Sequence, residues 1–409
     1  MVLLVLLALV AGVMPAYGTA SAPAQRASQR VCMPLTRPSG QHAWFDVATV
    51  NSQLARQWEH AICTAANGST IDLAIWFIGP NGRDTLTLID DLRRMHEFHG
   101  VHVNVIVGKS NYEPGPGYIK GFSYPQLLSA LSFAHVMSCY YGCRSSRRTA
   151  IAHSKFMTIS RNRAGFPAVL ESSANWDTEQ FEQTRQSGIY FGDDVPLYRA
   201  FIQRFHSMAA CARGNCASDV ADPVRKSHGV WYDTDHVIWR GISQSAAVYF
   251  DPLPAKDDPV ATRLSTMRCH GHGVVDVMTL YLTRVAVIRQ LKRLRREGCS
   301  LRILVEHPLG TRYQVSHLGE RCLGLTHDKV IAVKTGKQTL VIAGSEDWAT
   351  TSALTHDQQV VEDTRPSIYR AYAAYYQRAA RGSVPCRPLP PPAAAAYLAP
   401  GGLRLANES

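Results

Sequence analysis

The sequence has few of the features that would set it outside the ordinary globular class. Charged residues make up 18% of the 409 residues and aromatic residues 9%, against 46% hydrophobic residues. This composition excludes a wholly disordered chain, a collagen-like repeat and a coiled coil. After residues 2–14, the chain also lacks any apolar run approaching the roughly 20 residues that a membrane span needs. We therefore expect a soluble protein with two or three domain-sized units.

The only long apolar run is VLLVLLALVAGVM, at residues 2–14. Its length is typical of the hydrophobic part of a signal peptide, and Ala16, Tyr17 and Gly18 offer small residues for cleavage. No Lys or Arg precedes the run, so an uncleaved anchor is the alternative. We expect residues 1–18 to be a signal peptide and the mature protein to be secreted into the extracellular space.

The charge of the chain is biased towards the positive. Lys and Arg number 43 against 32 Asp and Glu, which gives a formal net charge of +11. A basic balance favours anionic partners such as phospholipid headgroups, nucleic acid or phosphate esters. The alternative is a basic surface without a specific partner.

A comparison of the two halves of the chain reveals a repeat. In the first half, a β-prone run at 70–78 precedes a helical pattern that ends at Gly100, and a second β-prone run follows at 101–107. The second half repeats this order with a run at 274–280, a helix that ends at Gly298 and a run at 301–305. The apolar helix positions Leu88, Ile89, Leu92 and Met95 match Val287, Ile288, Leu291 and Leu294. Each half therefore predicts a parallel β-α-β unit, and the whole chain predicts a duplicated α/β domain.

The ten cysteines form an even set, which in an exported chain predicts disulfides. Cys139 with Cys143, and Cys211 with Cys216, are spaced to close small loops. Positions around the repeated helices favour Cys269–Cys299 and make Cys32 the plausible partner of Cys63. A zinc site that includes Cys139, Cys143 and the run Cys269-His270-Gly271-His272 is the alternative, although the spacings do not fit a structural zinc module.

The repeat extends to polar residues. The first half has His153-Ser154-Lys155 and then Ser172-Ser173-Ala174-Asn175-Trp176, while the second has His327-Asp328-Lys329 and then Gly344-Ser345-Glu346-Asp347-Trp348. Each His-x-Lys opens a β-prone run, and residues i and i+2 of a strand face the same side. The histidine and lysine of each copy should therefore point in one direction.

This doubled pattern resembles the phospholipase D superfamily, over about Ser39 to Arg381, and looks closest to secreted bacterial phospholipase D-like proteins. The family signature is His-x-Lys, an Asp five residues after the Lys, and a Gly-Ser with a nearby Asn, present twice. The sequence departs from it at four positions: Ser160 and Lys334 replace the two acids, Ser172 replaces the glycine of the first copy, and Asp347 replaces the asparagine of the second.

The resemblance implies an α/β fold of two pseudo-symmetric α/β/α sandwich half-domains with mixed sheets. These half-domains would span residues 30–215 and 225–387, and the Pro/Ala-rich tail 388–409 would be flexible. The stretch from Lys109 to Thr149 has no counterpart of equal length in the second half. It is expected to form either a lid beside the site or a surface excursion.

The repeated His-Lys pairs suit the cleavage of a phosphodiester. A neutral imidazole can attack phosphorus, a protonated one can donate a proton to the leaving alcohol, and ammonium groups can neutralise the charge that builds up. The resemblance implies that His153 is the nucleophile and His327 the general acid, although the near symmetry leaves the reverse assignment open. It also implies phosphate contacts from Lys155, Lys329, Ser173, Asn175 and Ser345. Supporting roles fall to Asp347, which would hold Lys329 or His327, and to Asp357 and Glu182, which would orient an imidazole.

These inferences predict a secreted phospholipase D-like phosphodiesterase that cleaves phospholipids through a phosphohistidine, without metal or cofactor. An exported nuclease of the same superfamily, with nucleic acid as its substrate, is one alternative. A catalytically degenerate phosphate- or lipid-binding relative is the other. We expect a monomer whose partner is a phospholipid or another anionic phosphodiester. The basic residues along 284–296 are expected to be solvated and to give peripheral contact with an anionic membrane surface.

Overall fold

The computed structural model describes residues 32–47, 52–80, 82–113, 122–144, 150–215, 245–252, 258–306, 318–349, 352–353 and 356–386. The expected signal peptide (1–18) and the Pro/Ala-rich tail (388–409) lie outside the described residues. Among the helices that are described, none combines the length and the apolar character needed to cross a bilayer.

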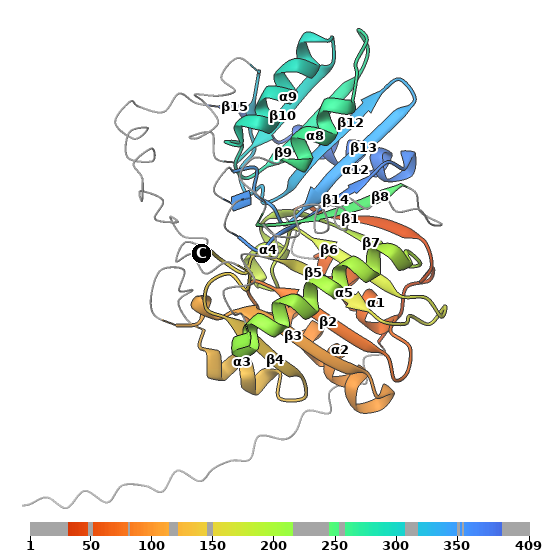
Figure 1. Ribbon diagram of the computed structural model, residues 1–409, viewed down its shortest axis with the longest axis vertical. Coiled ribbons are helices and arrows are strands. Elements are labelled where there is room, and N and C mark those ends of the chain that lie inside the picture. The colour runs from red at the N-terminus through yellow and green to blue at the C-terminus, as the bar shows by residue number, and fades with distance from the viewer. Residues whose placement is uncertain are drawn as a thin grey trace, which may run out of the picture. The chain divides into compact units, whose positions relative to one another are not determined.

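The first half of the chain builds a seven-stranded sheet with the strand order β1-β7-β6-β5-β2-β3-β4 (Figure 1). Its elements are β1 (Gln41–Val47), α1 (Gln53–Cys63), β2 (Thr70–Ile75), α2 (Arg83–His99), β3 (His102–Gly108), the 3-10 turn η1 (Lys109–Asn111), α3 (Tyr124–Ala130), β4 (His135–Cys139), β5 (Lys155–Ile159), β6 (Ala168–Ser172), α4 (Thr178–Glu182), β7 (Arg185–Phe191), α5 (Val195–Ala210) and the π turn η2 (Cys211–Asn215).

The second half builds an eight-stranded sheet with the strand order β15-β11-β10-β9-β12-β13-β14-β8. Its elements are β8 (Ala246–Phe250), α8 (Pro259–Thr266), β9 (Val274–Thr279), α9 (Val285–Arg296), β10 (Ser300–Val305), β11 (Arg321–Cys322), β12 (Lys329–Thr335), β13 (Gln338–Gly344), β14 (Gln359–Asp363), α12 (Pro366–Ala380) and β15 (Val384–Pro385).

The two sheets share one topology. When the second order is read from β8, each of its strands matches the strand at the same place in the first sheet, and β15 adds an extra edge. The predicted β-α-β units are confirmed, because β2 pairs in parallel with β3 and β9 pairs in parallel with β10. The other central pairs are antiparallel, so both sheets are mixed.

The helices cover both faces of each sheet, which confirms the predicted α/β/α sandwiches. In the first half, α1 and α2 bury an outer core against the sheet; in the second, α8 and α9 do the same. The apolar positions predicted from the helical spacing are those buried on α2 and α9. A third core combines α5 and α12 with strands of both sheets, so apolar packing joins the two halves.

Glycine ends the first repeated helix in the way its sequence predicts. Gly100 has φ +62°, and its N–H bonds back to the carbonyl of His96. This left-handed conformation is easily adopted by a residue without a Cβ atom and lets the chain turn directly into β3. The short connection places β3 in parallel beside β2.

The described cysteines are all in disulfides. The expected pairs Cys32–Cys63, Cys139–Cys143 and Cys269–Cys299 form, and Cys322–Cys386 is a further pair. Cys216 lies outside the described residues, so the predicted Cys211–Cys216 loop is not described. The cysteines of the alternative zinc site are therefore disulfide-bonded.

Candidate active site

Both His-x-Lys motifs lie at the start of a central strand. Lys155 is the first residue of β5 and Lys329 the first of β12, and each strand lies beside the first strand of its parallel β-α-β unit. His153, Lys155 and Lys329 are almost completely buried, and His327 is 6% exposed. The repeat therefore brings four titratable side chains into the interior of the protein.

Backbone hydrogen bonds between the halves hold the histidine segments. The N–H of Arg185 donates to the carbonyl of Leu325 at 2.7 Å, and the N–H of Asp357 donates to the carbonyl of Ile151 at 2.9 Å. Each bond ends two residues before a motif histidine, and each donor comes from the opposite half. The two bonds are therefore equivalent under the pseudo-twofold relation.

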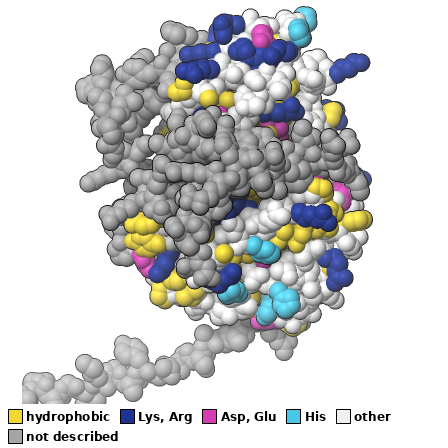
Figure 2. Space-filling view, in the orientation of Figure 1, with side chains coloured by type: hydrophobic (Ala, Val, Ile, Leu, Met, Phe, Trp, Pro, Cys, Tyr) yellow, Lys and Arg dark blue, Asp and Glu magenta, His cyan; other side chains and the backbone are white. Residues whose placement is uncertain are grey.

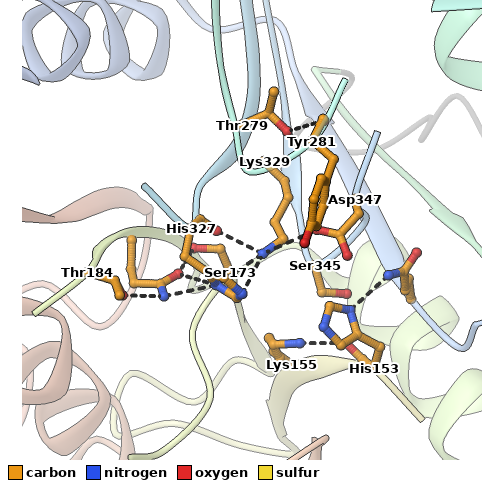
Figure 3. Close-up of polar contacts among 12 residues, drawn as sticks. His153, Lys155, Ser173, Thr184, Thr279, Tyr281, His327, Lys329, Ser345 and Asp347 are labelled. Carbon is orange, nitrogen blue, oxygen red and sulfur yellow. Dashed lines mark hydrogen bonds and ion pairs between the residues drawn. The ribbon is translucent and has the colours of Figure 1, made fainter. Parts of the chain in front are cut away.

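A glutamine from the opposite half contacts each imidazole. Nε2 of Gln358 lies 2.8 Å from Nδ1 of His153, and Nε2 of Gln186 lies 3.0 Å from Nδ1 of His327. Figure 3 shows the two His-Lys pairs converging on one region from the two halves. Each half thus contributes a glutamine to the histidine of the other half, and both histidines lie at the junction of the two halves.

The lysine side chains point back towards their histidines. Nζ of Lys155 donates to the carbonyl of His153 at 3.0 Å, and Nζ of Lys329 donates to the carbonyl of His327 at 2.8 Å. Nζ of Lys329 also lies 3.0 Å from Nδ1 and 3.1 Å from Nε2 of His327. The ammonium groups are thus held beside the rings, where they can face an anion bound between them.

Burial lowers the pKa of His153 well below its usual 6.5, and the positive charges of Lys155 and Lys329 lower it further. His356 and His327 act in the same direction. The ring of Trp76 packs edge-on against His153 with 5.0 Å between the centroids. His153 is therefore a neutral imidazole at neutral pH, the form that can act as a nucleophile.

The three phosphate-binding candidates other than the lysines lie in different environments. Ser173 Oγ donates to Gln186 Oε1 at 2.6 Å, and Ser345 Oγ donates to Gln359 Oε1 at 2.8 Å. These hydroxyls support the glutamine segments. Asn175 is 1% exposed, and within the described part of the chain neither its amide oxygen nor its amide nitrogen has a hydrogen-bond partner. An unsatisfied buried amide suits a group that awaits a polar ligand.

The residue that contacts the imidazole of His153 is Gln358, the neighbour of Asp357. The Asp357 carboxylate accepts instead from Nη2 of Arg204 at 2.9 Å and from the N–H of Arg144. Because alternate residues of an extended chain face opposite ways, only one of two neighbours can reach the imidazole. The pair Gln186 and Gln358 has the same offset, 172 residues, as Trp176 and Trp348. That shared register is the signal that would have identified the glutamines from the sequence.

The two other supporting acids also differ. Asp347 Oδ1 lies 3.5 Å from Nζ of Lys329, in line with one of its two expected roles. Glu182 ends α4 and is half-buried, and no contact between it and either motif histidine exists among the described residues. Gln186, and not Glu182, is the residue that contacts the imidazole of His327.

The positions of the two missing family acids lie away from the site. Ser160 follows β5 and accepts the N–H of Thr70 through its Oγ at 2.8 Å, and Lys334 is exposed near the end of β12. Five residues of extended strand span about 16 Å. The loss of these acids therefore removes no group from the neighbourhood of the imidazoles.

The comparisons with known proteins support the fold. No family model and no curated protein matches the sequence. Phosphatidylserine synthase from Haemophilus influenzae matches with a TM-score of 0.57 and 10% identity, over 83% of this chain and 86% of that chain. At this identity the likeness shows the fold alone.

Two further solved structures fall below a TM-score of 0.5, and we base no argument on them. Polyphosphate kinase from Porphyromonas gingivalis matches at 0.49 with 12% identity over 88% of this chain, which spans only 52% of that chain. Yeast tyrosyl-DNA phosphodiesterase matches at 0.44 with 10% identity, over 79% of this chain and 89% of that chain. The duplicated topology and the structural match agree with the resemblance drawn from the motifs: the chain has a duplicated α/β fold similar to that of the phosphatidylserine synthase, with a His-x-Lys pair in each half.

Proposed function

We propose that the protein is a secreted, monomeric phosphodiesterase of the phospholipase D type that cleaves phospholipids through a phosphohistidine. One observation carries the proposal. Each motif histidine is contacted by a glutamine of the other half, at 2.8 and 3.0 Å, which supports a single site that contains both imidazoles. A single phosphorus atom between two such rings can be attacked from one side while its leaving group is protonated from the other.

The reaction then has two steps. The Nε2 lone pair of His153 attacks phosphorus, the bond from phosphorus to the alcohol oxygen breaks, and His327 gives its proton to that oxygen. In the second step His327 takes a proton from water, the water oxygen bonds to phosphorus, and the P–N bond electrons return to His153. Lys155 and Lys329 neutralise the phosphoryl oxygens throughout, and the Asn175 amide can donate to them.

Phospholipid is the proposed substrate class for three reasons. The structural neighbour at TM-score 0.57 is named a phosphatidylserine synthase. The chain is basic, and the exposed face of α9 carries Arg289, Lys292, Arg295 and Arg296. Figure 2 shows Lys and Arg side chains gathered over this part of the second half, a surface suited to anionic headgroups. Arg284, expected on the same face, is instead buried in ion pairs with Asp258 and Glu346.

Secretion is proposed from the apolar N-terminal run and the cysteines. Disulfides form and persist in oxidising compartments such as the extracellular space. The four described pairs would need such an environment to form.

The purified protein should be tested on phosphatidylcholine vesicles and on plasmid DNA, each with a chelator present. We expect choline release that His153→Ala abolishes and that His135→Ala, a change at the exposed start of β4, leaves intact. DNA nicking without choline release would overturn the lipid proposal in favour of a nuclease. Vesicle binding with no cleavage of either substrate would favour a binding protein.

A further inference from the structure

The amide groups of Gln186 and Gln358 are held in different ways. Thr184 Oγ1 donates its hydrogen to the carbonyl of Gln180 at 3.0 Å, so at 2.8 Å from the Gln186 amide it can only accept. That contact identifies the Gln186 amide nitrogen, and Ser173 Oγ donates to the amide oxygen on the other side at 2.6 Å. The orientation of the Gln186 amide is therefore locked by its neighbours.

Gln358 has no such lock. Its Nε2 lies 2.8 Å from Nδ1 of His153, and its Oε1 is buried without a hydrogen-bond partner anywhere in the described residues. If the amide rotates by half a turn, its hydrogen bond to Nδ1 through Nε2 is replaced by one through Oε1. The number of hydrogen bonds therefore stays the same. The half-turn places the carbonyl oxygen opposite Nδ1, where it can accept a proton.

The two imidazoles need different things from their glutamines. An imidazole that attacks through Nε2 must carry its proton on Nδ1, and that proton needs an acceptor. An imidazole that gives and takes a proton must be supported in both states. Both Nε2 and Oε1 of Gln186 lie within reach of Nδ1 of His327, at 3.0 and 3.2 Å, so this amide can donate to the neutral ring or accept from the protonated one.

On the basis of the proposed function, we infer that Gln358 is the positioning residue of the nucleophile. Its carbonyl oxygen holds the Nδ1 proton of His153 and leaves the Nε2 lone pair to attack phosphorus, while Gln186 supports His327 as it releases and recovers a proton. The different surroundings of the two amides thus distinguish the roles of His153 and His327, which the near symmetry of the motifs leaves open.

The charges around His153 agree with this assignment. Lys155, Lys329, His356 and His327 are the titratable groups that act on it, and all of them disfavour its protonated form. Gln358 is neutral, so it adds no negative charge that would stabilise an imidazolium. At neutral pH, His153 therefore loses its attacking form when the proton moves from Nδ1 to Nε2, and this is the change that Gln358 controls.

Nitrogen NMR tests the inference without any need for turnover. Long-range proton–nitrogen spectra of protein labelled with ¹⁵N-histidine report which ring nitrogen carries the proton, and the His153 signals are assigned by their loss in His153→Asn. We expect the proton on Nδ1 in the wild-type protein and its shift to Nε2 in Gln358→Leu, with His327 unchanged. A wild-type His153 with its proton on Nε2 overturns the inference.

Leaving-group dependence provides the second test. Gln358→Leu should lower kcat by about 10- to 100-fold with KM unchanged, for both phosphatidylcholine and a p-nitrophenyl phosphodiester. Gln358→Glu keeps an acceptor and should recover part of this loss while moving the acid limb of the pH profile upward. Gln186→Leu should slow the formation of the phosphohistidine only from the choline ester, because nitrophenolate leaves without a proton. The hydrolysis step, in which His327 takes a proton from water, should slow equally for both substrates.

Gln338→Leu at the exposed start of β13 is the matched control and should keep the wild-type rate. If Gln358→Leu slowed only the choline ester, the two roles would be reversed and the inference wrong. If the wild-type protein cleaves no phosphodiester at all, the proposed function fails, and the NMR result still decides how Gln358 holds His153.

Discussion

At the scale of single residues, the two motif histidines differ in their surroundings. His153 is 1% exposed and packs against Trp76, while His327 is 6% exposed and has Nζ of Lys329 within 3.1 Å of both ring nitrogens. Burial and the lysines lower the pKa of His153, so its neutral form persists below the usual value of 6.5. The two histidines occupy equivalent positions in the repeated motifs, but the fold gives them different environments.

The depressed pKa of His153 predicts the acid side of the activity profile. Because the neutral ring attacks, protonation of His153 switches the enzyme off, and a lowered pKa delays that protonation to a lower pH. We therefore expect kcat/KM to stay level through pH 6.5 and to fall only below it, measured from pH 4.5 to 8 with chelator. An acid limb centred at or above pH 6.5 would contradict this prediction.

At the scale of elements, the segment that leads into β14 joins the halves. The Asp357 carboxylate receives Nη2 of Arg204 from α5 and the N–H of Arg144 from the insertion, and its carbonyl receives Ser154 Oγ at 3.1 Å. Asp357 and Arg204 are both buried. This contact fixes the residue beside Gln358 and so fixes the amide against His153.

Removing one member of this buried ion pair should be costly. Asp357→Asn leaves the Arg204 guanidinium without its carboxylate, so we expect a loss of about 3–5 kcal/mol in the free energy of unfolding, measured by denaturant titration. Asp90→Asn is the matched control because its ion pair with Arg93 is exposed, and it should cost less than about 1 kcal/mol. We also expect Arg204→Met combined with Asp357→Leu to recover part of the loss. Equal effects of Asp357→Asn and Asp90→Asn would contradict the role given to this contact.

At the scale of the whole molecule, acids buried at the junction link stability to pH. Burial and the nearby Asp328 raise the pKa of Glu171 from 4.5 to about 8, and Asp328 itself is raised to about 6 by burial. Glu171 is therefore protonated in the folded protein at neutral pH but ionised in the unfolded chain. The contribution of Glu171 to the free energy of unfolding is fully present below pH 4.5 and is lost as the pH rises to about 8.

Glu171→Gln should remove this dependence. We expect the variant to have a Tm on the order of a few degrees above that of the wild-type protein at pH 8 and to match it near pH 4.5. Glu97→Gln on the exposed side of α2 serves as the control and should follow the wild-type curve. A Glu171→Gln variant that is less stable at pH 8 would show that the carboxylate is needed as a charge.

Periodicity predicted the parts of the fold that depend on local sequence. The apolar spacing identified the buried faces of α2 and α9, and the His-x-Lys register placed Lys155 and Lys329 at strand starts. The hydrogen-bond and disulfide partners that depend on tertiary contacts were not predictable from periodicity. Gln358, which lies just before β14, carries no local mark of its role, so it was missed in favour of the acid beside it. Cys322–Cys386 likewise joins segments that only the fold brings together.

The central claim is that the two imidazoles serve one phosphorus atom, and the rates of the single and double histidine variants test it most directly. If the claim holds, His153→Ala and His327→Ala will each lower kcat on phosphatidylcholine by about 10³-fold or more, and the double variant will be scarcely slower than either. Two separate sites would instead leave each single variant with a large part of the wild-type rate and only the double variant inactive, and that result would contradict the account.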